Sequence, residues 1–567
     1  MTGTAAPQAS WIAKSNEHAQ VVLAHIARFH PEVGSLFGLA GADERIVDLG
    51  EGIDERRVAA ARLVLGDLEQ RLAGESETNV RQDLAIMIDL LRREIERGLA
   101  TTKLLLPYDN VPETIFRGMH TLLLEHNPPE RRRLALVRLA RYAGEGGTPV
   151  LVDAAARWRE RASQAGLLGP ARAEVEKNLA DHAALIGGIA PLFAAAQVTG
   201  FEAALASLQG QLAVYETFVR EEVLPRARAE FRLPGELYRL ALRDVGVDME
   251  LEELVGRAQV SFREIQNEMN ALAPLVAREQ GLPPGDYRAV LRALKAKQFE
   301  GDAILPHYQS RMRDLEAIIE REQIVTLPAR AAQIRLASAG ETAAQPAPHM
   351  QPPRLIGNTG ERGTFVLPLR MTASPGEEAM AYDDFTFEAA SWTLTAHEGR
   401  PGHELQFAAI VEQGVSIARA LFAFNSVNVE GWALYMEAEA KPYEPLDGQL
   451  AALQHRLLRA ARAFLDPGVQ AGTIAVAEAT RVLTGDVVVS PAMARQETER
   501  YTFRAPGQAT SYFCGYQRLM ALRAEAERVL GARFDRRRYH DFLLSQGLLP
   551  PTLLRQAVLE EFVPAQR

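Results

Sequence analysis

Hydrophobic and polar positions follow a helical period through the N-terminal half of the chain. From about Val58 to Gln323, apolar side chains recur three and four positions apart, a spacing that gathers them on one face of an α-helix. Within residues 81–97, for example, Leu84, Ile88 and Leu91 fall on the same face. The pattern therefore predicts a succession of amphipathic helices whose Arg- and Glu-rich positions form solvated outer faces.

The helical period stops at Ser338–Pro353, where Ala, Gly, Gln and Pro predominate, and this segment is predicted to be a loop. We place a boundary here, between an N-terminal helical lobe at residues 1–337 and a C-terminal helical lobe at residues 338–567. The two lobes are expected to form one structural unit. Next comes Glu361–Pro368, the best strand candidate, because β-branched and aromatic residues favour an extended backbone and Pro368 ends it.

Helical patterns resume after this strand and continue toward the C-terminus. The predicted helices are Phe385–Glu398, His403–Gln413, Val429–Lys441, Leu446–Leu465, Ile474–Thr484, Ala492–Thr502 and Ala509–Leu530. Because helix candidates far outnumber strand candidates, the predicted fold class is mainly α. No repeated unit recurs along the chain, which argues against a regular solenoid.

The composition is that of a soluble globular protein. Of the 567 residues, 47% are hydrophobic and 24% are charged, close to the average for such proteins. The net charge of −10 argues against a nucleic-acid partner, which would require a basic surface. The composition leaves the oligomeric state open.

One uncharged stretch, Ala183–Phe201, approaches the length of a membrane span. Gly187 and Pro191 interrupt it, so we predict a buried pair of helices joined by a turn, and no membrane association. The N-terminus has neither a basic nor an apolar leader region, and a cytoplasmic location is expected on that basis.

Cys514 is the single cysteine of the chain, which excludes an intramolecular disulfide and any multi-cysteine metal site. A metal ion would therefore have to be held by His, Asp or Glu. Most of the twelve histidines are scattered, but His397 and His403 lie close together, with Glu398 directly after the first.

The spacing of these two histidines departs from the usual zinc-peptidase helix, in which the ligands are four residues apart. A separation of six would point the imidazoles roughly 120° apart on an uninterrupted helix. Gly399, Pro401 and Gly402 are poor helix-interior residues, however, and they indicate a break that lets the two imidazoles converge. On spacing alone, a metal site and an ordinary structural His–Glu pair both remain open.

Glu430 is the candidate third ligand, because it lies in the first turn of a predicted helix downstream of His403. Two His and one Glu leave a coordination position for water, which is typical of catalytic zinc. Glu398 would then be the general base. Glu437 shares a helix face with Glu430 and is a candidate to orient one of the histidines. The alternative to a ligand role for Glu430 is a common structural one, because acidic residues in the first turn of a helix interact favourably with the helix dipole.

Three sequence blocks together resemble the bacterial family called domain of unknown function 885. They are His397–Gln406, Glu430–Tyr435 and Arg500–Gly515, and the resemblance extends over most of the chain. The family is similar to the helical gluzincin peptidases of the oligopeptidase and carboxypeptidase types. The resemblance implies a large two-lobed helical body around a deep channel, with one zinc ion at its floor.

The resemblance also assigns roles to residues. It implies that the zinc ligands are His397, His403 and Glu430 and that the base is Glu398. It implies an edge strand near the active site that pairs with an extended peptide through Gly363, Thr364 and Phe365. It also implies candidates for positioning the substrate or for stabilising the oxyanion, namely Tyr501, Gln508, Tyr512 and Tyr516. The alternative for these four residues is ordinary packing on a helix.

Two positions depart from the family pattern. Many relatives have a histidine at the position of Glu404, and many have another at the position of Gln470. A glutamine can donate a hydrogen bond but cannot carry a proton or a charge. These departures bear on the rate and the substrate more than on the metal site.

The predicted function is that of a zinc-dependent metallopeptidase that hydrolyses short peptides, as a dipeptidase, carboxypeptidase or oligopeptidase, through a metal-activated water. Two alternatives stay open: an amidohydrolase that acts on a non-peptide metabolite, and a non-catalytic helical binding protein with a retained metal site. A glycosidase built on paired carboxylates has little support in a mainly helical chain with this histidine block.

Overall fold

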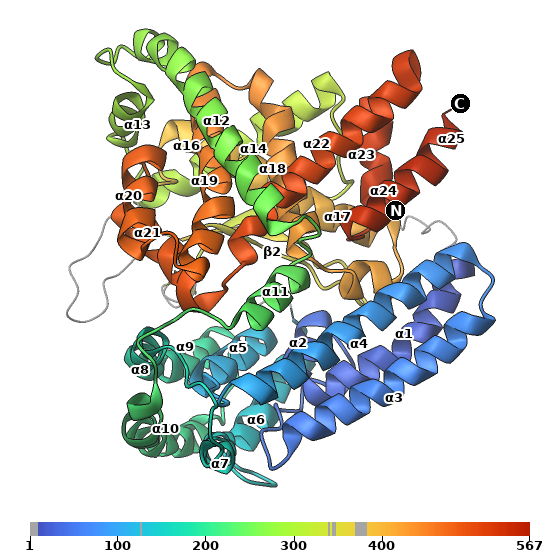
Figure 1. Ribbon diagram of the computed structural model, residues 1–567, viewed down its shortest axis with the longest axis vertical. Helices are drawn as coiled ribbons and strands as arrows, with labels where there is room; N and C mark the ends of the chain where they lie inside the picture. The colour runs from blue at the N-terminus through green and yellow to red at the C-terminus, as the bar shows by residue number, and fades with distance from the viewer. Residues whose placement is uncertain (1–9, 125–126, 338–340, 343–346, 369–382, 567) are drawn as a thin grey trace. The chain divides into compact units, whose positions relative to one another are not determined.

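The computed structural model describes residues 10–124, 127–337, 341–342, 347–368 and 383–566. The predicted mainly α fold class is confirmed, since helices make up most of these residues (Figure 1). Contacts divide the chain into two compact units, the first containing residues 1–237, 354–361 and 416–418 and the second containing the rest. This division places residues 238–337 with the C-terminal part, whereas the boundary drawn from the sequence groups them with the N-terminal lobe.

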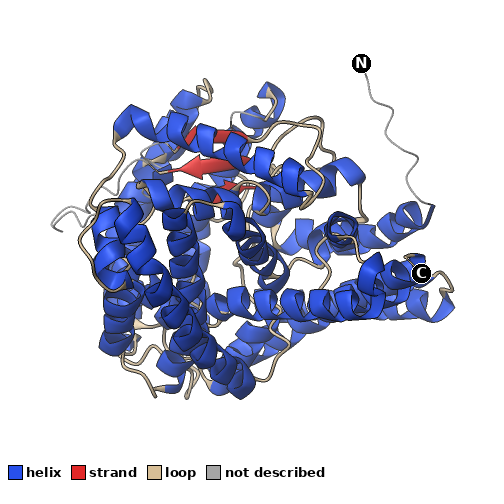
Figure 2. Ribbon diagram, turned by 90° about the horizontal axis from the view of Figure 1, so that it is seen from above, coloured by secondary structure: helices blue, strands red, loops and turns tan. Residues whose placement is uncertain are grey.

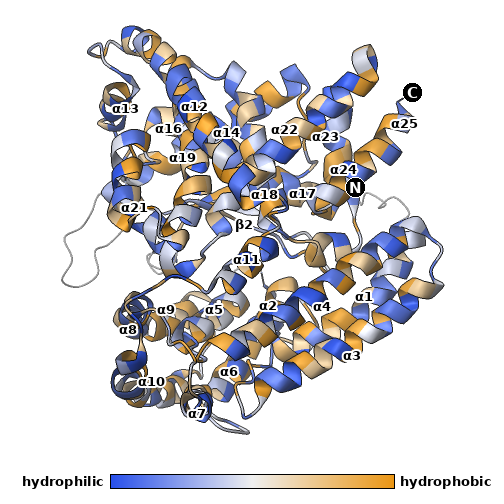
Figure 3. Ribbon diagram, viewed as in Figure 1, coloured by the Kyte–Doolittle hydropathy of each residue, from blue (hydrophilic) through white to orange (hydrophobic). Residues whose placement is uncertain are grey.

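The first unit is built of helices. They are α1 (Ser10–Phe29), α2 (Pro31–Phe37), α3 (Ile53–Gly74), α4 (Thr78–Leu104), α5 (Val111–Leu123), α6 (Pro129–Tyr142), α7 (Val150–Ala162), α8 (Arg172–Gly187), α9 (Ile189–Ala195) and α10 (Glu202–Phe218). Apolar and polar residues alternate along α3 and α4, as Figure 3 shows, and the apolar positions of α4 at Leu84, Ile88 and Leu91 are buried as predicted. Burial of these faces supplies the main stabilisation of the unit.

The predicted break in the uncharged stretch falls at Gly188, between the end of α8 and the start of α9. Ile186, Ile189 and Phe193 on either side of it are buried in the core of the first unit. Among the described residues, no helix combines the length and the apolar character needed to cross a bilayer.

The second unit holds the remaining helices. The larger ones are α11 (Gly235–Asp244), α12 (Leu251–Glu279), α13 (Tyr287–Lys295), α14 (Ile304–Glu322), α16 (Glu388–Glu398), α17 (His403–Gln413), α18 (Ser426–Ala440), α19 (Leu446–Ala471), α20 (Val476–Arg481), α21 (Pro491–Glu499), α22 (Ser511–Leu530), α23 (Arg536–Ser545) and α24 (Pro551–Ala557). The long α19 packs along α12 and α16, and α18 packs along α22. These three helix–helix packings position the candidate site.

A three-stranded sheet lies among the helices of this unit (Figure 2). Its order is β1 (Gln333–Leu336), β3 (Thr364–Leu367), β2 (His349–Gln351), with β1 parallel and β2 antiparallel to β3. Two predictions are wrong here. The strand at Thr364 is central rather than an edge, and β2 falls within the segment predicted to be a loop.

The composition of the strands explains both errors. Phe365, Val366 and Leu367 are fully buried, as suits a central strand covered on both faces. The outer strands β1 and β2 are short and contain Gln, Arg and His, so neither carries a recognisable alternation of apolar and polar residues. Pairing with the apolar β3 gives them their extended form.

Candidate metal centre

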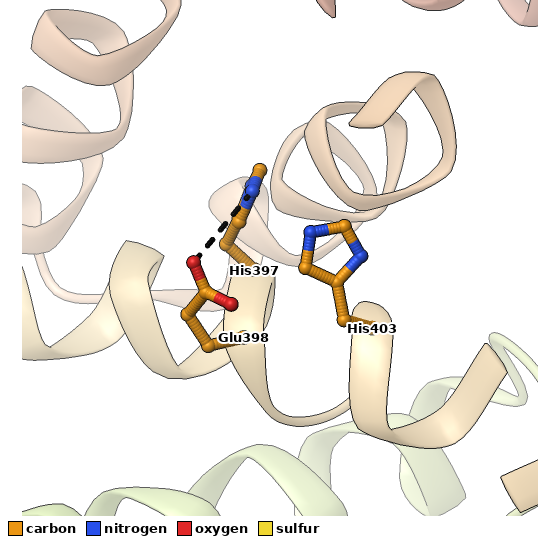
Figure 4. Close-up of side chains that lie close together, drawn as sticks. All are labelled: His397, Glu398 and His403. Atoms are coloured by element: carbon orange, nitrogen blue, oxygen red, sulfur yellow. Dashed lines mark ion pairs between the residues drawn. The ribbon is translucent and has the colours of Figure 1, made fainter. Parts of the chain in front are cut away.

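The break between the two histidines is a compact loop. The helix α16 ends at Glu398, and α17 begins at His403, so the chain turns within Gly399–Gly402. A Cβ atom on Gly402 would overlap the carbonyl oxygen of His397, and one on Gly399 would lie 2.6 Å from the carbonyl oxygen of Thr395. Glycine is therefore required at both positions. The turn brings the imidazole rings of His397 and His403 to a centroid separation of 4.7 Å (Figure 4).

Glu430 on α18 completes the cluster. Its Oε2 lies 3.3 Å from Nε2 of His397 and 3.3 Å from Nε2 of His403. A tetrahedral zinc ion bound at about 2.0–2.1 Å requires its ligand atoms to lie about 3.4 Å apart. The two separations from Glu430 Oε2 thus match the distance between ligand atoms of a tetrahedral zinc ion.

The hydrogen bonding of Glu430 also suits a metal ligand. Its Oε2 is buried, yet it accepts no hydrogen bond from the described residues. Burial would raise the pKa of this carboxyl group, but the neighbouring imidazoles of His397 and His403 hold it well below the usual range. An ionised, buried oxygen without a hydrogen-bond donor is costly unless a cation faces it. The donor set therefore fits a zinc ion held by His397, His403 and Glu430.

His397 is oriented by a second carboxylate. Its Nδ1 lies 2.6 Å from Oε1 of Glu437, whose other oxygen accepts a hydrogen bond of 2.6 Å from Oγ1 of Thr393. Burial alone would raise the pKa of Glu437, but Arg459 and His397 lower it to about 2. An ionised Glu437 holds the proton on Nδ1 and leaves the lone pair of Nε2 directed at Glu430 and the metal position.

Glu398 lies beside the three candidate ligands. Its Oε1 is 4.0 Å from Nε2 of His397, the contact that Figure 4 marks with a dashed line. Its Oε2 accepts a hydrogen bond of 2.9 Å from the backbone N–H of Met350 in β2. Ligand atoms of His397, Glu398 and His403 all lie within 4.8 Å of one another. The carboxylate of Glu398 is therefore held beside the candidate metal position.

Two side chains hold the loop between the histidines. Trp432 Nε1 donates to the carbonyl oxygens of Pro401 and Gly402, at 3.1 and 3.3 Å. Arg400 Nε donates to Glu404 Oε2 at 2.6 Å. Glu404, at the first departure from the family pattern, is almost fully buried. Its pairing with Arg400 fixes the loop.

The cavity beside the metal position has a volume of about 110 Å³. Tyr512 lines it, and the ring of this tyrosine stacks on His397 with a centroid distance of 6.3 Å. Other lining residues, which the sequence did not single out as functional, are His455, Arg459 and Arg462. Their only sequence signal was a pair of arginines three apart on one helix, a pattern that ordinarily marks a solvated face.

The other predicted substrate-binding residues do not line this cavity. The hydroxyl of Tyr501 donates to Glu497 at 2.9 Å, and the side-chain amide of Gln508 donates to Ser426 at 3.0 Å. Tyr516 is buried on α22. Gln470, at the second departure from the family pattern, donates to the carbonyl oxygens of Tyr501 and Thr502.

Gly363, Thr364 and Phe365 do not form a free strand edge, because β3 pairs on both sides. Phe365 is fully buried and packs edge-on against Tyr308 at 5.6 Å. The prediction that these residues pair with a peptide is therefore wrong. Their apolar character, which identified the strand, also places it at the centre of the sheet.

The fold and the cluster define a class of protein: a mainly α-helical chain with a cluster of histidine and glutamate side chains that could hold a metal ion. Within that class, the chain belongs to the family described as bacterial protein of unknown function (DUF885), which matches residues 31–558. The predicted membership is confirmed. Among curated proteins, none matches the chain.

Two solved structures share the fold over nearly the whole chain. One is described as a "putative lipoprotein of unknown function from Shewanella oneidensis", at 19% identity and a TM-score of 0.72, covering 97% of this chain and 100% of that one. The other, a "putative lipoprotein from Colwellia psychrerythraea", has 18% identity and a TM-score of 0.76, covering 98% and 100%. A "putative oligoendopeptidase F from Bacillus anthracis" has 12% identity and a TM-score of 0.30 over 90% and 96%, a likeness too low to support an argument.

The predicted cytoplasmic location is contradicted by these relatives. Both structures that share the fold are described as lipoproteins. The prediction rested on the absence of a leader pattern in the N-terminal residues, and such an absence does not determine where a protein resides.

Proposed function

We propose that the protein is a zinc-dependent metallopeptidase that hydrolyses short peptides. The observation that carries this proposal is the 3.3 Å convergence of Glu430 Oε2 with the Nε2 atoms of His397 and His403, beside the carboxylate of Glu398. Three protein ligands leave a fourth position open for water, as catalytic zinc requires.

A zinc ion bound here would supply a Lewis acid that polarises the substrate carbonyl and lowers the pKa of bound water. Glu398 would accept a proton from the water that attacks the carbonyl carbon and would pass it to the nitrogen of the leaving amine as the C–N bond breaks. The N–H of Met350 holds one oxygen of Glu398, so the other is free to face the water. Burial keeps the pKa of Tyr512 above its usual range, so its hydroxyl stays protonated and can donate to the developing oxyanion.

The edge strand β2 is the better candidate for pairing with an extended substrate. Met350 pairs with Phe365 in β3, but its N–H donates to Glu398 rather than to the sheet. The outer side of β2 therefore faces the metal position. A peptide added alongside β2 would bring its carbonyl groups near Glu398 through main-chain hydrogen bonds.

Metal content and a peptide screen test the proposal. Protein purified without added metal should contain zinc, and mass spectrometry should show cleavage of a mixture of short peptides that a chelator abolishes and zinc restores. His403→Ala should lose both the zinc and the activity, whereas Glu412→Gln, on the outer part of the same helix, should keep both. Negligible zinc together with no hydrolysis after zinc addition would refute the proposal.

A further inference from the structure

Three arginines line the cavity beside the metal position: Arg459 and Arg462 on α19, and Arg500 directly after α21. Arg459 and Arg462 are almost completely buried, and 23% of the side chain of Arg500 is exposed. Removing guanidinium groups from water is costly unless carboxylates or other acceptors replace the lost hydration. We therefore compare the N–H donors of the three arginines with the acceptors that surround them.

Glu497 is the carboxylate closest to these three arginines, and it forms a salt bridge with Arg462. Arg462 donates to both of its oxygens at 2.7 Å, and the hydroxyl of Tyr501 donates to one of them at 2.9 Å. Arg500 reaches it only at 3.6 Å, beyond hydrogen-bond distance. One carboxylate thus satisfies one of the three guanidinium groups.

Arg459 and Arg500 retain donors without acceptors. Nε of Arg459 and Nη1 of Arg500 are buried and form no hydrogen bond with any described residue. The closest carboxylate to Arg459 is Glu437 at 3.5 Å, and Glu437 is already bonded to His397 and Thr393. The buried, unused N–H groups of these two guanidinium groups therefore lie beside the same small cavity.

A neighbouring histidine reflects the same excess of positive charge. His455 also lines the cavity. Burial, and then the charge of Arg459, lower the pKa of its imidazole to about 3, so it adds no further cation at neutral pH. The ring of Tyr512 lies 4.5 Å from the guanidinium carbon of Arg462 and 5.8 Å from that of Arg459. This aromatic face stabilises the cations partly but cannot accept their in-plane N–H bonds.

We propose that Arg459 and Arg500 bind a carboxylate of the substrate on one side of the scissile bond. This inference rests on the proposed function and adds the substrate class, because a guanidinium group recognises a carboxylate through two parallel hydrogen bonds. The carboxylate has two possible sources: the C-terminus of the peptide, which makes the enzyme release one residue at a time, and an acidic side chain next to the cleaved bond.

Three matched peptides distinguish these sources. They are an N-blocked tripeptide with a free C-terminus, the same tripeptide as its C-terminal amide, and a longer amidated peptide with a single glutamate. Rates and cleavage positions are measured by mass spectrometry. Recognition of the C-terminus predicts that the free acid has kcat/KM about 100-fold above its amide. Recognition of a side chain predicts cleavage of the glutamate peptide beside the glutamate at a comparable advantage.

Arg500→Gln should remove most of that advantage, so that kcat/KM of the carboxylate-bearing peptide falls toward that of the neutral amide. Arg504→Gln is the matched control, because Arg504 is exposed and pairs with Glu499 in the same segment, and it should keep the wild-type ratio. Equal rates for acid, amide and glutamate peptides in the wild-type protein would overturn the proposal. So would an unchanged ratio in a folded, zinc-loaded Arg500→Gln protein.

Binding separates the anion site from the catalytic proposal. Calorimetry with zinc-loaded Glu398→Gln and the same peptides should show tighter binding of the carboxylate-bearing peptides than of the neutral amide, by about 100-fold. Preferential binding without turnover by the wild-type protein would refute the peptidase function and leave the anion site supported. Equal binding of all three would refute the anion site.

Discussion

Glu437 determines which nitrogen of His397 is available for a metal. Replacement by glutamine removes the charge that holds the proton on Nδ1 while it preserves the shape of the side chain. Glu437→Gln should weaken zinc binding by about 10- to 100-fold, measured by competition with a chromophoric chelator. Glu439→Gln, two residues further along the same helix, should leave the affinity unchanged. Equal zinc affinities of Glu437→Gln and the wild-type protein would contradict this role.

The sequence predicts which residues form the candidate site better than it predicts which side chains they contact. The block at His397, the break at Gly399–Gly402 and the carboxylate of Glu430 follow from spacing and from the known behaviour of glycine and proline in helices. The arginines of the cavity could not be predicted, because their burial depends on how α19 packs. Tyr501 was identified as a candidate from its position in a family motif, but nothing in the sequence indicated that its hydroxyl donates to Glu497.

The crossing of α18 and α22 determines where Glu430 and Tyr512 lie. Gly515 faces Gly431 there, and a Cβ on Gly515 would overlap the carbonyl oxygen of Val427 and lie 2.6 Å from Cα of Gly431. Gly515→Ala should therefore lower the free energy of unfolding by about 2–3 kcal/mol, measured by urea unfolding. Gly256→Ala, in α12 with no described atom within 4 Å of the added Cβ, should raise it by about 0.5–1 kcal/mol. The same stability for both variants would refute the close crossing.

A buried ion pair joins α1 and α4 in the first unit. Nε2 of His25 lies 2.9 Å from Oε1 of Glu94, and His30 lies 3.7 Å from the same oxygen. Burial would raise the pKa of Glu94, but these histidines lower it to about 2 from a usual 4.5. Because the pKa is lower in the folded state, the stabilisation is present above pH 4.5 and is lost as the pH falls toward 2.

Glu94→Gln should remove this dependence. Between pH 5 and pH 2.5, its free energy of unfolding should change less than that of the wild-type protein, by on the order of 3 kcal/mol. Urea unfolding at a series of pH values measures the difference, and Glu69→Gln, an exposed carboxylate on α3, should keep the wild-type slope. Parallel curves for Glu94→Gln and the wild-type protein would show that the pair does not stabilise the fold.

Helices with clear amphipathic faces could be predicted, whereas the small sheet could not. The boundaries of α17 were predicted at His403 and Gln413, as found. The helix α19 continues to Ala471, beyond the predicted end at Leu465, because its buried face extends through Asp466 and Pro467. The strands β1 and β2 are specified by their partner β3 rather than by their own residues, so a single-sequence pattern could not reveal them.

At the scale of the whole molecule, zinc binding should stabilise the native state. A ligand that binds only the folded protein adds about 4 kcal/mol at a concentration 1,000-fold above its Kd. Removal of metal by a chelator should therefore lower Tm by several degrees, and stoichiometric zinc should restore it, as measured by scanning calorimetry. His397→Ala should show no response to either treatment. A wild-type Tm that chelation does not change would contradict a structural contribution from the metal.

The relatives of known structure share this fold across their whole length, so the arrangement of helices is common to them. Their low identity to this chain shows the fold alone. The activity therefore has to be argued from the site, where three ligand atoms, a neighbouring carboxylate and a cationic cavity come together.

Zinc content and turnover of Glu398→Gln, measured on one preparation, test the central claim most directly. The account predicts one zinc ion per chain, as in the wild-type protein, because Glu398 is not a ligand. It also predicts a fall in kcat of about 10²- to 10⁴-fold, because the water loses its general base. Peptide hydrolysis at the wild-type rate by a zinc-loaded Glu398→Gln protein would contradict the account.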